Sequence, residues 1–224
     1  MPRVDKILAS RGGYSRKIAT KMLRRGRVRV NDEIIRKASE QVPEDCLLTV
    51  DGYEIPQLHP ILLFHKPAGM LTSMGDNWGR DCVGDFVPPR YHIVGRLDLE
   101  TRGLLLLSLD GQLTQNLLHP KRGIEREYIA TVEGEPDQGL IERLAEGIPT
   151  SVGTAQGEVI AIDGNTVRVI MREGKNRIVR RMLHNAGFSV MDLFRVRFGP
   201  FELDDLEEGA IRPASQEEYN QLKE

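Results

Sequence analysis

The stretch VGRLDLETRGLLLLSLDG, residues 94–111, places a cluster of opposite charges directly before a continuous apolar run. The charged side chains are those of Arg96, Asp98, Glu100 and Arg102. They have two possible meanings: surface ion pairs in a solvated loop, where each pair contributes little, or a reacting carboxylate at the mouth of a core sheet. A carboxylate in such a place can act as a nucleophile or as a base. The rest of the chain must decide the role of Asp98.

The histidines and cysteines give no metal-binding pattern. The five histidines show neither HxxxH nor HxH spacing, and Cys46 and Cys82 lie far apart in the sequence. Two such thiols are most simply interpreted as free and structural, in a reducing compartment. We therefore expect no metal site.

The composition is that of a globular protein without a membrane segment. A length of 224 residues allows two small domains or one large one, with a sizeable core. No apolar run approaches the roughly 20 residues of a membrane helix, and the first residues, MPRVDKILAS, lack the apolar core of a signal peptide. No exposed apolar stripe is evident. We expect a cytoplasmic monomer.

The net charge of −2 hides a strong asymmetry between the two ends of the chain. Residues 1–30 contain ten Lys or Arg and a single acid, whereas the last 23 residues contain eight acids and two bases. A basic head of this kind indicates a polyanionic partner, although a solvated helix face is the commoner meaning of any one charge run. We assign no function to the acidic tail.

The first 55 residues predict two helices followed by short strands. A helix is expected over 4–10, and Ser15 is a natural N-cap for a second helix that ends near Gly26, with Ile18, Met22 and Leu23 facing inward. Alternation in 27–35 predicts a hairpin that turns at 31–32, and 47–55 predicts another short strand with an Asp-Gly turn.

This first unit resembles the S4 RNA-binding domain over about residues 3–54. The resemblance rests on Val4-Asp5-Lys6, Gly13-x-Ser15-Arg16, Ala19 and the segment 26–31, GRVRVN. It implies structured RNA as the ligand, which the charges alone would not distinguish from DNA. Contacts to several phosphates would make the affinity fall steeply with salt. The candidate RNA-binding residues are Arg16, Lys17, Lys21, Arg24, Arg25, Arg27 and Arg29.

A second domain is expected after a linker at 57–60. Strands are predicted at 61–64 and 126–134, a hairpin at 157–174 and a final strand pair from 188, with helices at 110–120, 136–148 and 175–187. Because the strands outnumber the helices and join mostly by short turns, we predict an α+β fold with a mixed, largely antiparallel sheet. The predicted domains are 1–58 and 59–224.

Four segments of this second domain, spread over residues 61–213, resemble the RsuA/RluB-type family of ribosomal RNA pseudouridine synthases. They are Lys66-Pro67-x-Gly69, Gly95-Arg96-Leu97-Asp98 with Thr101 and Gly103, Arg126-Glu127-Tyr128, and 174–181, GKNRIVRR. In this family uridine becomes pseudouridine when the N1–C1′ bond breaks, the uracil turns and C5 bonds to C1′. The resemblance implies the pseudouridine synthase fold, ribosomal RNA of either subunit (16S or 23S) or a ribosome assembly intermediate as partner, and no cofactor, because no group enters or leaves.

The resemblance implies that Asp98, Tyr128 and Arg180 are catalytic. Asp98 would add to C1′ or take a sugar proton, and the sequence leaves both open. Burial would raise its pKa, and Arg180 is expected to lower it again. Tyr128 would stack on the extruded uracil and act near C5 as a base or proton relay, although a packing role in its strand is also open.

Four residues are expected to bind the substrate. Leu193 would line the base pocket or belong to the core, and Arg96 would shape the catalytic loop or bind phosphate. Lys66 and Arg177 are candidates for phosphate contacts, with a solvated face as the alternative. We also expect the bases of segment 175–197 to offset the cost of base extrusion through contacts to the RNA backbone. They are Lys175, Arg177, Arg180, Arg181, Arg195 and Arg197.

Two other function classes stay open from the sequence. The chain could be a catalytically silent RNA-binding or ribosome-assembly factor, although such a protein has no need of all three catalytic residues. A glycoside hydrolase acting on nucleosides would normally use a second carboxylate; Glu100 and Asp110 are nearby in sequence, but the motif gives neither that role. The details of 125–128 and 174–181 favour the large-subunit members of the family.

Overall fold

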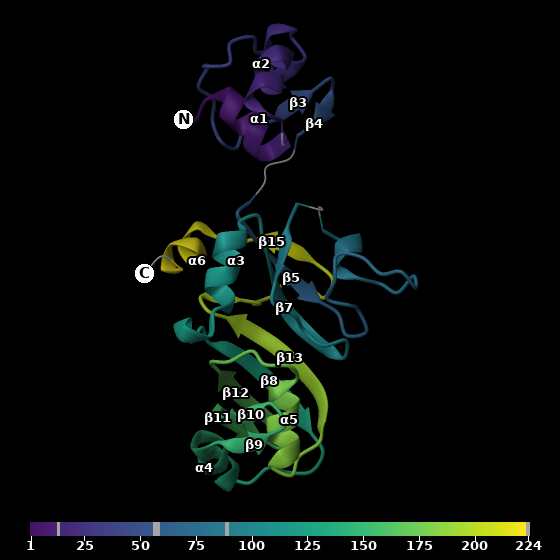
Figure 1. Cartoon of the computed structure of the whole chain (residues 1–224), viewed down its shortest axis with the longest axis vertical. Helices are drawn as coiled ribbons and strands as arrows, with labels where there is room; N and C mark the ends of the chain where they lie inside the picture. Colours follow the sequence, from purple (N-terminus) through teal and green to yellow (C-terminus); the bar gives the residue numbers. More distant parts are fainter. Residues whose placement is uncertain (13, 56–58, 88–89, 223–224) are drawn as a thin grey trace. The chain divides into compact units, whose positions relative to one another are not determined.

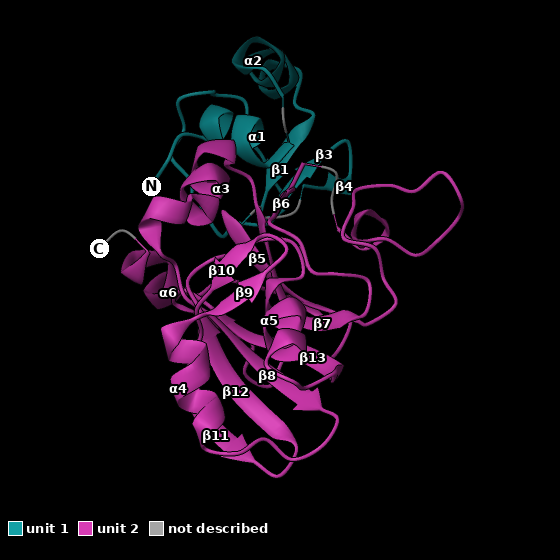
Figure 2. Ribbon diagram, turned by 60° about the horizontal axis from the view of Figure 1, so that its bottom comes forward, with its two compact units in different colours: residues 1–59 teal, residues 60–224 magenta. Residues whose placement is uncertain are grey.

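The computed structural model describes residues 1–12, 14–55, 59–87 and 90–222. The chain divides into two compact units, Met1–His59 and Pro60–Glu224 (Figure 2), and each is described by itself. Of the linker expected at 57–60, residues 57 and 58 lie outside the described residues. Among the described residues, every helix is too short or too polar to span a bilayer.

Unit 1 consists of two helices and a small antiparallel sheet. Helix α1 spans Val4–Gly12 and α2 spans Arg16–Arg24, and the predicted cap is confirmed because the Ser15 side chain accepts a hydrogen bond from the backbone of Ile18. The sheet has the order β2-β1-β3-β4. Its strands are β1 Val28–Val30, β2 Glu33–Ile34, β3 Leu48–Val50 and β4 Tyr53–Glu54. Both predicted turns are confirmed by the residues between the paired strands.

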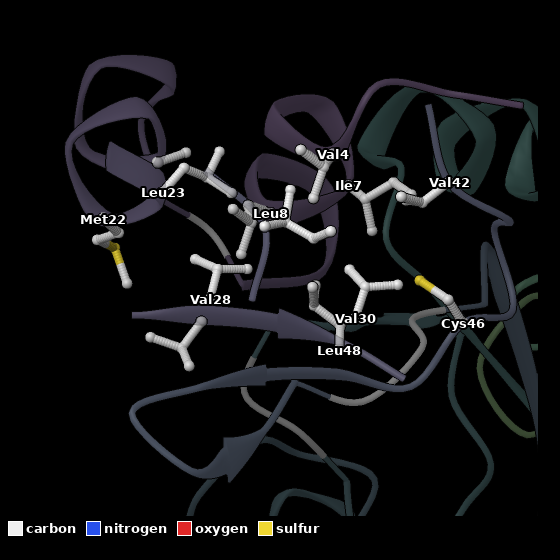
Figure 3. Packing of buried hydrophobic residues seen from close by; sticks show 13 residues of the cluster. Val4, Ile7, Leu8, Met22, Leu23, Val28, Val30, Val42, Cys46 and Leu48 are labelled. Carbon is white, nitrogen blue, oxygen red and sulfur yellow. The ribbon is translucent and has the colours of Figure 1, made fainter. Parts of the chain in front are cut away.

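The core of unit 1 lies between its helices and its sheet (Figure 3). Leu8 from α1, Leu23 from α2 and Val28 from β1 are fully buried there and pack in one cluster. The expectation that Ile18 faces this core is wrong, because 51% of its surface is exposed. Residues three and four positions apart share a helix face, and in α2 the buried face contains Ala19, Met22 and Leu23 instead.

Unit 2 is built on a nine-stranded sheet with the order β11-β12-β8-β13-β7-β5-β15; β14 pairs with β13, and β6 with β7. The predicted mixed, largely antiparallel sheet is confirmed, since only the pairing of β13 with β7 is parallel among the pairings described. The strands are β5 Ile61–Lys66, β6 His92–Val94, β7 Thr101–Ser108, β8 Arg126–Val132, β11 Glu158–Asp163, β12 Thr166–Met171, β13 Val190–Phe198, β14 Phe201–Glu202 and β15 Ile211–Pro213.

Helices and a small hairpin surround this sheet (Figure 1). They are α3 Gly111–Leu118, α4 Gly139–Glu146, α5 Ile178–Asn185, α6 Gln216–Gln221, the short 3-10 turns Val83–Asp85 and Pro120–Arg122, and the hairpin of β9 Ile148–Thr150 with β10 Gly153–Ala155. Helix α5 begins later than the predicted residue 175, because Arg177 has a left-handed backbone with φ of 51° that ends the preceding turn. Within the acidic tail, β15 pairs with β5, and Ser215 and Glu218 cap α6 reciprocally.

Strand β7 is the rigid centre of unit 2. All of its residues except Arg102 are buried, and it pairs with β5 on one side and with β13 and β6 on the other. Such a strand needs a continuous apolar run, because both of its faces are covered. At Gly103, with φ of 111°, an added Cβ would lie 2.3 Å from the backbone oxygen of Arg195, so only glycine allows this close approach of β13.

Candidate active site

A pocket of about 410 Å³ lies over one face of the sheet in unit 2. That volume is within the usual range for small-molecule sites. The pocket is bounded by the loop 94–98, by the end of α3, by the segment 172–179 and by strands β8 and β13. The residues central to its chemistry are Arg96, Asp98, Arg126, Tyr128, Glu173, Lys175, Arg177, Leu193 and Arg195.

Asp98 lies in the loop that leads into β7, and backbone contacts fix this loop. The carbonyl of Asp98 accepts a hydrogen bond from the backbone of Thr101 at 3.0 Å, and Leu99 accepts one from Gly69 at 2.7 Å. The hydroxyl of Thr72 donates to the carbonyl of Leu97 at 2.6 Å. The Asp98 side chain is 26% exposed and lines the pocket. A held but accessible carboxylate is what a nucleophile or base requires.

The cation nearest to Asp98 among the described residues is Arg177. One guanidinium nitrogen of Arg177 lies 4.0 Å from an oxygen of Asp98 and 2.9 Å from an oxygen of Glu100. Hydrogen bonding to Arg177 contributes to lowering the pKa of Glu100, after a larger effect of its own backbone. Arg177 therefore joins two carboxylates of the catalytic loop. Its expected place near the substrate is consistent with this position, since it also lines the pocket.

Arg180, which we expect to act on the charge of Asp98, lies farther from this carboxylate than Arg177 does. Arg180 makes no ion pair with Asp98 among the described residues. It donates instead to the carbonyl of Val190 at 3.1 Å, to the carbonyl of Glu100 at 3.2 Å and to the hydroxyl of Thr101 at 3.4 Å. Burial lowers the pKa of Arg180, and the charges of Glu100 and Asp98 oppose that shift. Arg180 thus holds the backbone of the loop, and its attraction to Asp98 acts at longer range.

The expectation that Lys66 contacts phosphate is wrong for this structure. Lys66 is fully buried, and its ammonium donates to the carbonyls of Pro67 at 2.7 Å and Thr101 at 2.9 Å. Burial lowers its pKa from 10.5 to about 8, and the charges of Asp98 and Glu100 partly oppose this shift. Lys66 therefore joins the end of β5 to the start of β7 from inside the protein.

Tyr128 and Leu193 form an apolar part of the pocket lining. Tyr128 is 8% exposed in β8, and Leu193 is 3% exposed in β13. Leu193 lies opposite Ala130, whose side chain shares a strand face with that of Tyr128. Arg96 is exposed and lines the same pocket. The structure thus brings together Asp98, Tyr128, Leu193, Arg96 and Arg177, and leaves Lys66 and Arg180 outside the lining.

Two buried arginines of the pocket were not predicted as site residues. Arg126 is 6% exposed and Arg195 is 3% exposed, and both line the pocket. The expectation that Arg195 contacts the RNA backbone is not supported, because its side chain is buried in the sheet. Strand periodicity could have found both: Arg126 precedes Tyr128 by two residues and Arg195 follows Leu193 by two, so each pair shares a strand face.

Comparison with known proteins shows the family and the fold of the chain. A family described as RNA pseudouridylate synthase matches residues 60–185, and the S4 domain family matches residues 2–45. The chain belongs to the RNA pseudouridylate synthase family. The chain is similar to an uncharacterized RNA pseudouridine synthase of Mycobacterium leprae, with 38% identity covering 98% of this chain and 91% of the relative.

Two further relatives of this pseudouridylate synthase carry more specific information. The ribosomal large subunit pseudouridine synthase B of Bacillus subtilis is 32% identical, and the match covers 100% of this chain and 96% of the Bacillus protein. The crystal structure of a pseudouridylate synthase matches with a TM-score of 0.68 and 29% identity, over 99% of this chain and 100% of the other. The predicted pseudouridine synthase fold with an N-terminal S4 domain is confirmed.

The synthase exposes all seven of its candidate RNA-binding residues in unit 1. Three of them have partners on the protein: Arg27 forms an ion pair with Asp51, Arg29 donates to the carbonyl of Asp32 at 2.8 Å, and Arg16 lies 3.6 Å from a carboxylate oxygen of Asp5. The other four side chains make no ion pair within the described part of the chain. They are Lys17, Lys21, Arg24 and Arg25, all on or next to α2.

The described residues of the synthase contain no group of three or more His, Cys, Asp or Glu side chains placed to hold a metal ion. Cys46 and Cys82 are both free and buried, as predicted.

Proposed function

We propose that this enzyme isomerises a specific uridine of ribosomal RNA to pseudouridine, with Asp98 as the catalytic carboxylate. The observation that carries the assignment is the position of Asp98 in the pocket, on a fixed loop and beside Tyr128 and Leu193 in the lining. Of the described lining residues, Glu173 also carries a carboxylate, but the ammonium of Lys175 lies 2.7 Å from it. Asp98 is the lining carboxylate without such a close partner.

The reaction makes few demands, and the pocket residues can meet them. Asp98 either adds to C1′ or removes a sugar proton as the N1–C1′ bond breaks, and in both cases the bonding electrons leave with the uracil. Tyr128 and Leu193 offer apolar surface on which the detached base can turn. C5 then bonds to C1′ as the Asp98–C1′ bond breaks or, on the other route, as the sugar proton returns. The C5 proton passes to a base, for which the Tyr128 oxygen is our candidate, and N1 takes up a proton.

The rim of the pocket suits an RNA strand. Arg96, Lys175 and Arg177 line the pocket and carry side chains that water reaches. Exposed cations of this kind bind backbone phosphates and release counterions. These contacts, with those of unit 1, would offset the few kcal/mol that extruding a uridine from folded RNA costs.

We propose RNA of the large ribosomal subunit as the substrate. Relatives from Bacillus subtilis and Vibrio cholerae are named ribosomal large subunit pseudouridine synthase B, and the latter is 33% identical over 99% of this chain.

We also propose that the protein acts as a monomer in the cytoplasm. The free, buried thiols of Cys46 and Cys82 support a reducing compartment.

The test compares wild type, Asp98→Asn and Asp163→Asn on ribosomal RNA from cells that lack the gene, with pseudouridine mapped by sequencing. Asp163 is an exposed carboxylate at the β11–β12 turn, so its amide variant is the matched control. We expect wild type and Asp163→Asn to modify one position and Asp98→Asn to modify none while still binding the RNA. Full conversion by Asp98→Asn would refute the assignment of the carboxylate. If Asp98→Asn restores ribosome assembly in the deletion strain, the silent-factor interpretation gains support.

A further inference from the structure

The arginines on the two faces of the central sheet differ in whether they have a carboxylate partner. On the face away from the pocket, Arg197 lies 3.0 Å from Glu127, and Arg168 pairs with the same carboxylate. The strand register places Arg195 opposite Tyr128, and Phe198 opposite Arg126, on the pocket face. Among the described residues, no carboxylate lies within ion-pair distance of Arg126 or Arg195. The arginines on the face away from the pocket are therefore paired with a carboxylate, whereas the charges of Arg126 and Arg195 on the pocket face are not.

Arg195 has unused hydrogen-bond donors inside the protein. Its Nε donates to the carbonyl of Leu104 at 2.8 Å, but its Nη2 is buried without a partner in the described structure. Arg126 donates to the carbonyls of Ile124 at 2.9 Å and Leu117 at 3.5 Å. Buried polar groups are normally satisfied, so an orphaned guanidinium nitrogen in a residue that lines a pocket indicates a missing acceptor.

An aromatic ring holds the two cations close together. The guanidinium carbons of Arg126 and Arg195 lie 4.6 Å and 5.3 Å from the centre of the Phe198 ring. Cation–π contacts favour the charges but cannot neutralise them. Burial lowers the pKa of Arg126, and the positive charge of Arg195 lowers it further. An unpaired buried charge is costly. An anion bound in the pocket would pair with these two guanidinium groups and remove that cost.

We propose that Arg195, supported by Arg126, binds the detached uracil and stabilises its negative charge during isomerisation. This inference rests on the proposed function. When the N1–C1′ bond breaks, its electron pair stays on the uracil. C1′ then either bonds to the Asp98 carboxylate or forms a double bond as a sugar proton is lost. The charge spreads over N1 and the two carbonyl oxygens, which can accept hydrogen bonds from a guanidinium. It is neutralised when C5 bonds to C1′; the C5 proton then leaves and N1 takes up a proton.

The position of the two arginines favours the uracil over a phosphate of the same RNA. Phosphate is strongly hydrated and is met by the solvent-accessible cations of the pocket, the exposed Lys175 and the partly exposed Arg177. Arg126 and Arg195 instead lie at the sheet next to Tyr128 and Leu193 in the lining, where an apolar, flat group belongs. A delocalised anion such as uracil loses less hydration than a phosphate on entering such a place.

The test uses single-turnover cleavage of the target N-glycoside in a ribosomal RNA fragment, with uridine or 5-fluorouridine at the target position. Fluorine withdraws electrons and stabilises the leaving anion without protein help. For Arg195→Gln we expect a rate constant about 100-fold below wild type with uridine, by analogy with the loss of one oxyanion donor. With 5-fluorouridine the loss should be clearly smaller, and Arg195→Lys should recover part of the rate. Arg126→Gln should follow the same pattern more weakly.

Arg168→Gln is the matched control, because it removes a guanidinium from the opposite face of the sheet and should change neither rate. RNA affinity and thermal unfolding of each variant show whether it is folded. Equal losses on both substrates would overturn the proposal and leave a structural role for Arg195. A weakened RNA affinity with an unchanged rate constant would overturn it in favour of a phosphate clamp. If wild type converts neither substrate, the proposed function itself fails, which is a separate outcome.

Discussion

Arg177 bridges Asp98 and Glu100, with one guanidinium nitrogen 4.0 Å from the first carboxylate and 2.9 Å from the second. Its left-handed backbone, with φ of 51°, ends the loop that precedes α5 and brings the side chain to the catalytic loop. The segment 172–177 and the loop 94–100 thus share a cation, although they are far apart in the sequence.

Arg177→Gln should slow the conversion of bound RNA by about fivefold, because a half-exposed ion pair contributes up to about 1 kcal/mol. Arg177→Lys should retain most of the rate, since it keeps a positive charge near Asp98. Single-turnover rate constants at saturating enzyme separate this effect from RNA affinity. An equal loss in both variants would show that the guanidinium geometry, not its charge, is what Asp98 needs.

Arg180→Ala should reduce the rate more than Arg177→Gln does. Arg180 reaches two backbone carbonyls and a hydroxyl, and hydrogen bonds to charged groups contribute roughly 1.5–3 kcal/mol each. Removing them should release the loop after Asp98. Amide hydrogen exchange of Thr101, whose N–H donates to the carbonyl of Asp98, should therefore become faster. Unchanged exchange with a lost rate would instead favour direct contact between Arg180 and the substrate.

The sequence predicted the strands that carry the site residues better than it predicted which side chains pair with one another. Alternation and the leucine run predicted the strands that contain Tyr128, Leu193 and residues 104–107, because strands follow from local patterns. The roles of Tyr128 and Leu193 came from the family resemblance. The partners of Asp98 could not be read in this way. Arg177 and Arg180 lie three residues apart, and only the left-handed turn at Arg177 decides which of them reaches the carboxylate. Lys66 was misjudged because its burial depends on residues distant in the sequence: it pairs with Gly103 of β7, and its ammonium donates to the carbonyl of Thr101.

Lys66 predicts a pH dependence of stability. Its pKa is lowered by burial from 10.5 to about 8, so between these pH values the unfolded chain binds more protons than the folded protein. The free energy of unfolding gained from this group should therefore rise with pH from about 8 toward 10. Urea unfolding at pH 7.5 and 9.5 tests this. Lys66→Met should lack this rise, and the difference between the two proteins cancels the other titrating groups. Parallel pH profiles would contradict the buried position of Lys66.

The basic face of α2 should dominate the salt dependence of RNA binding. Arg25 is exposed and makes no ion pair within the described residues, whereas Arg27 already pairs with Asp51. Each phosphate contact contributes roughly 0.7–0.9 to the slope of log affinity against log salt. Arg25→Gln should lower the slope by about that amount, and Arg27→Gln by less, because binding RNA through Arg27 first requires giving up Asp51. Filter binding of a ribosomal RNA fragment over a salt series measures both slopes. Equal changes for the two variants would mean that the pair with Asp51 opens freely when RNA binds.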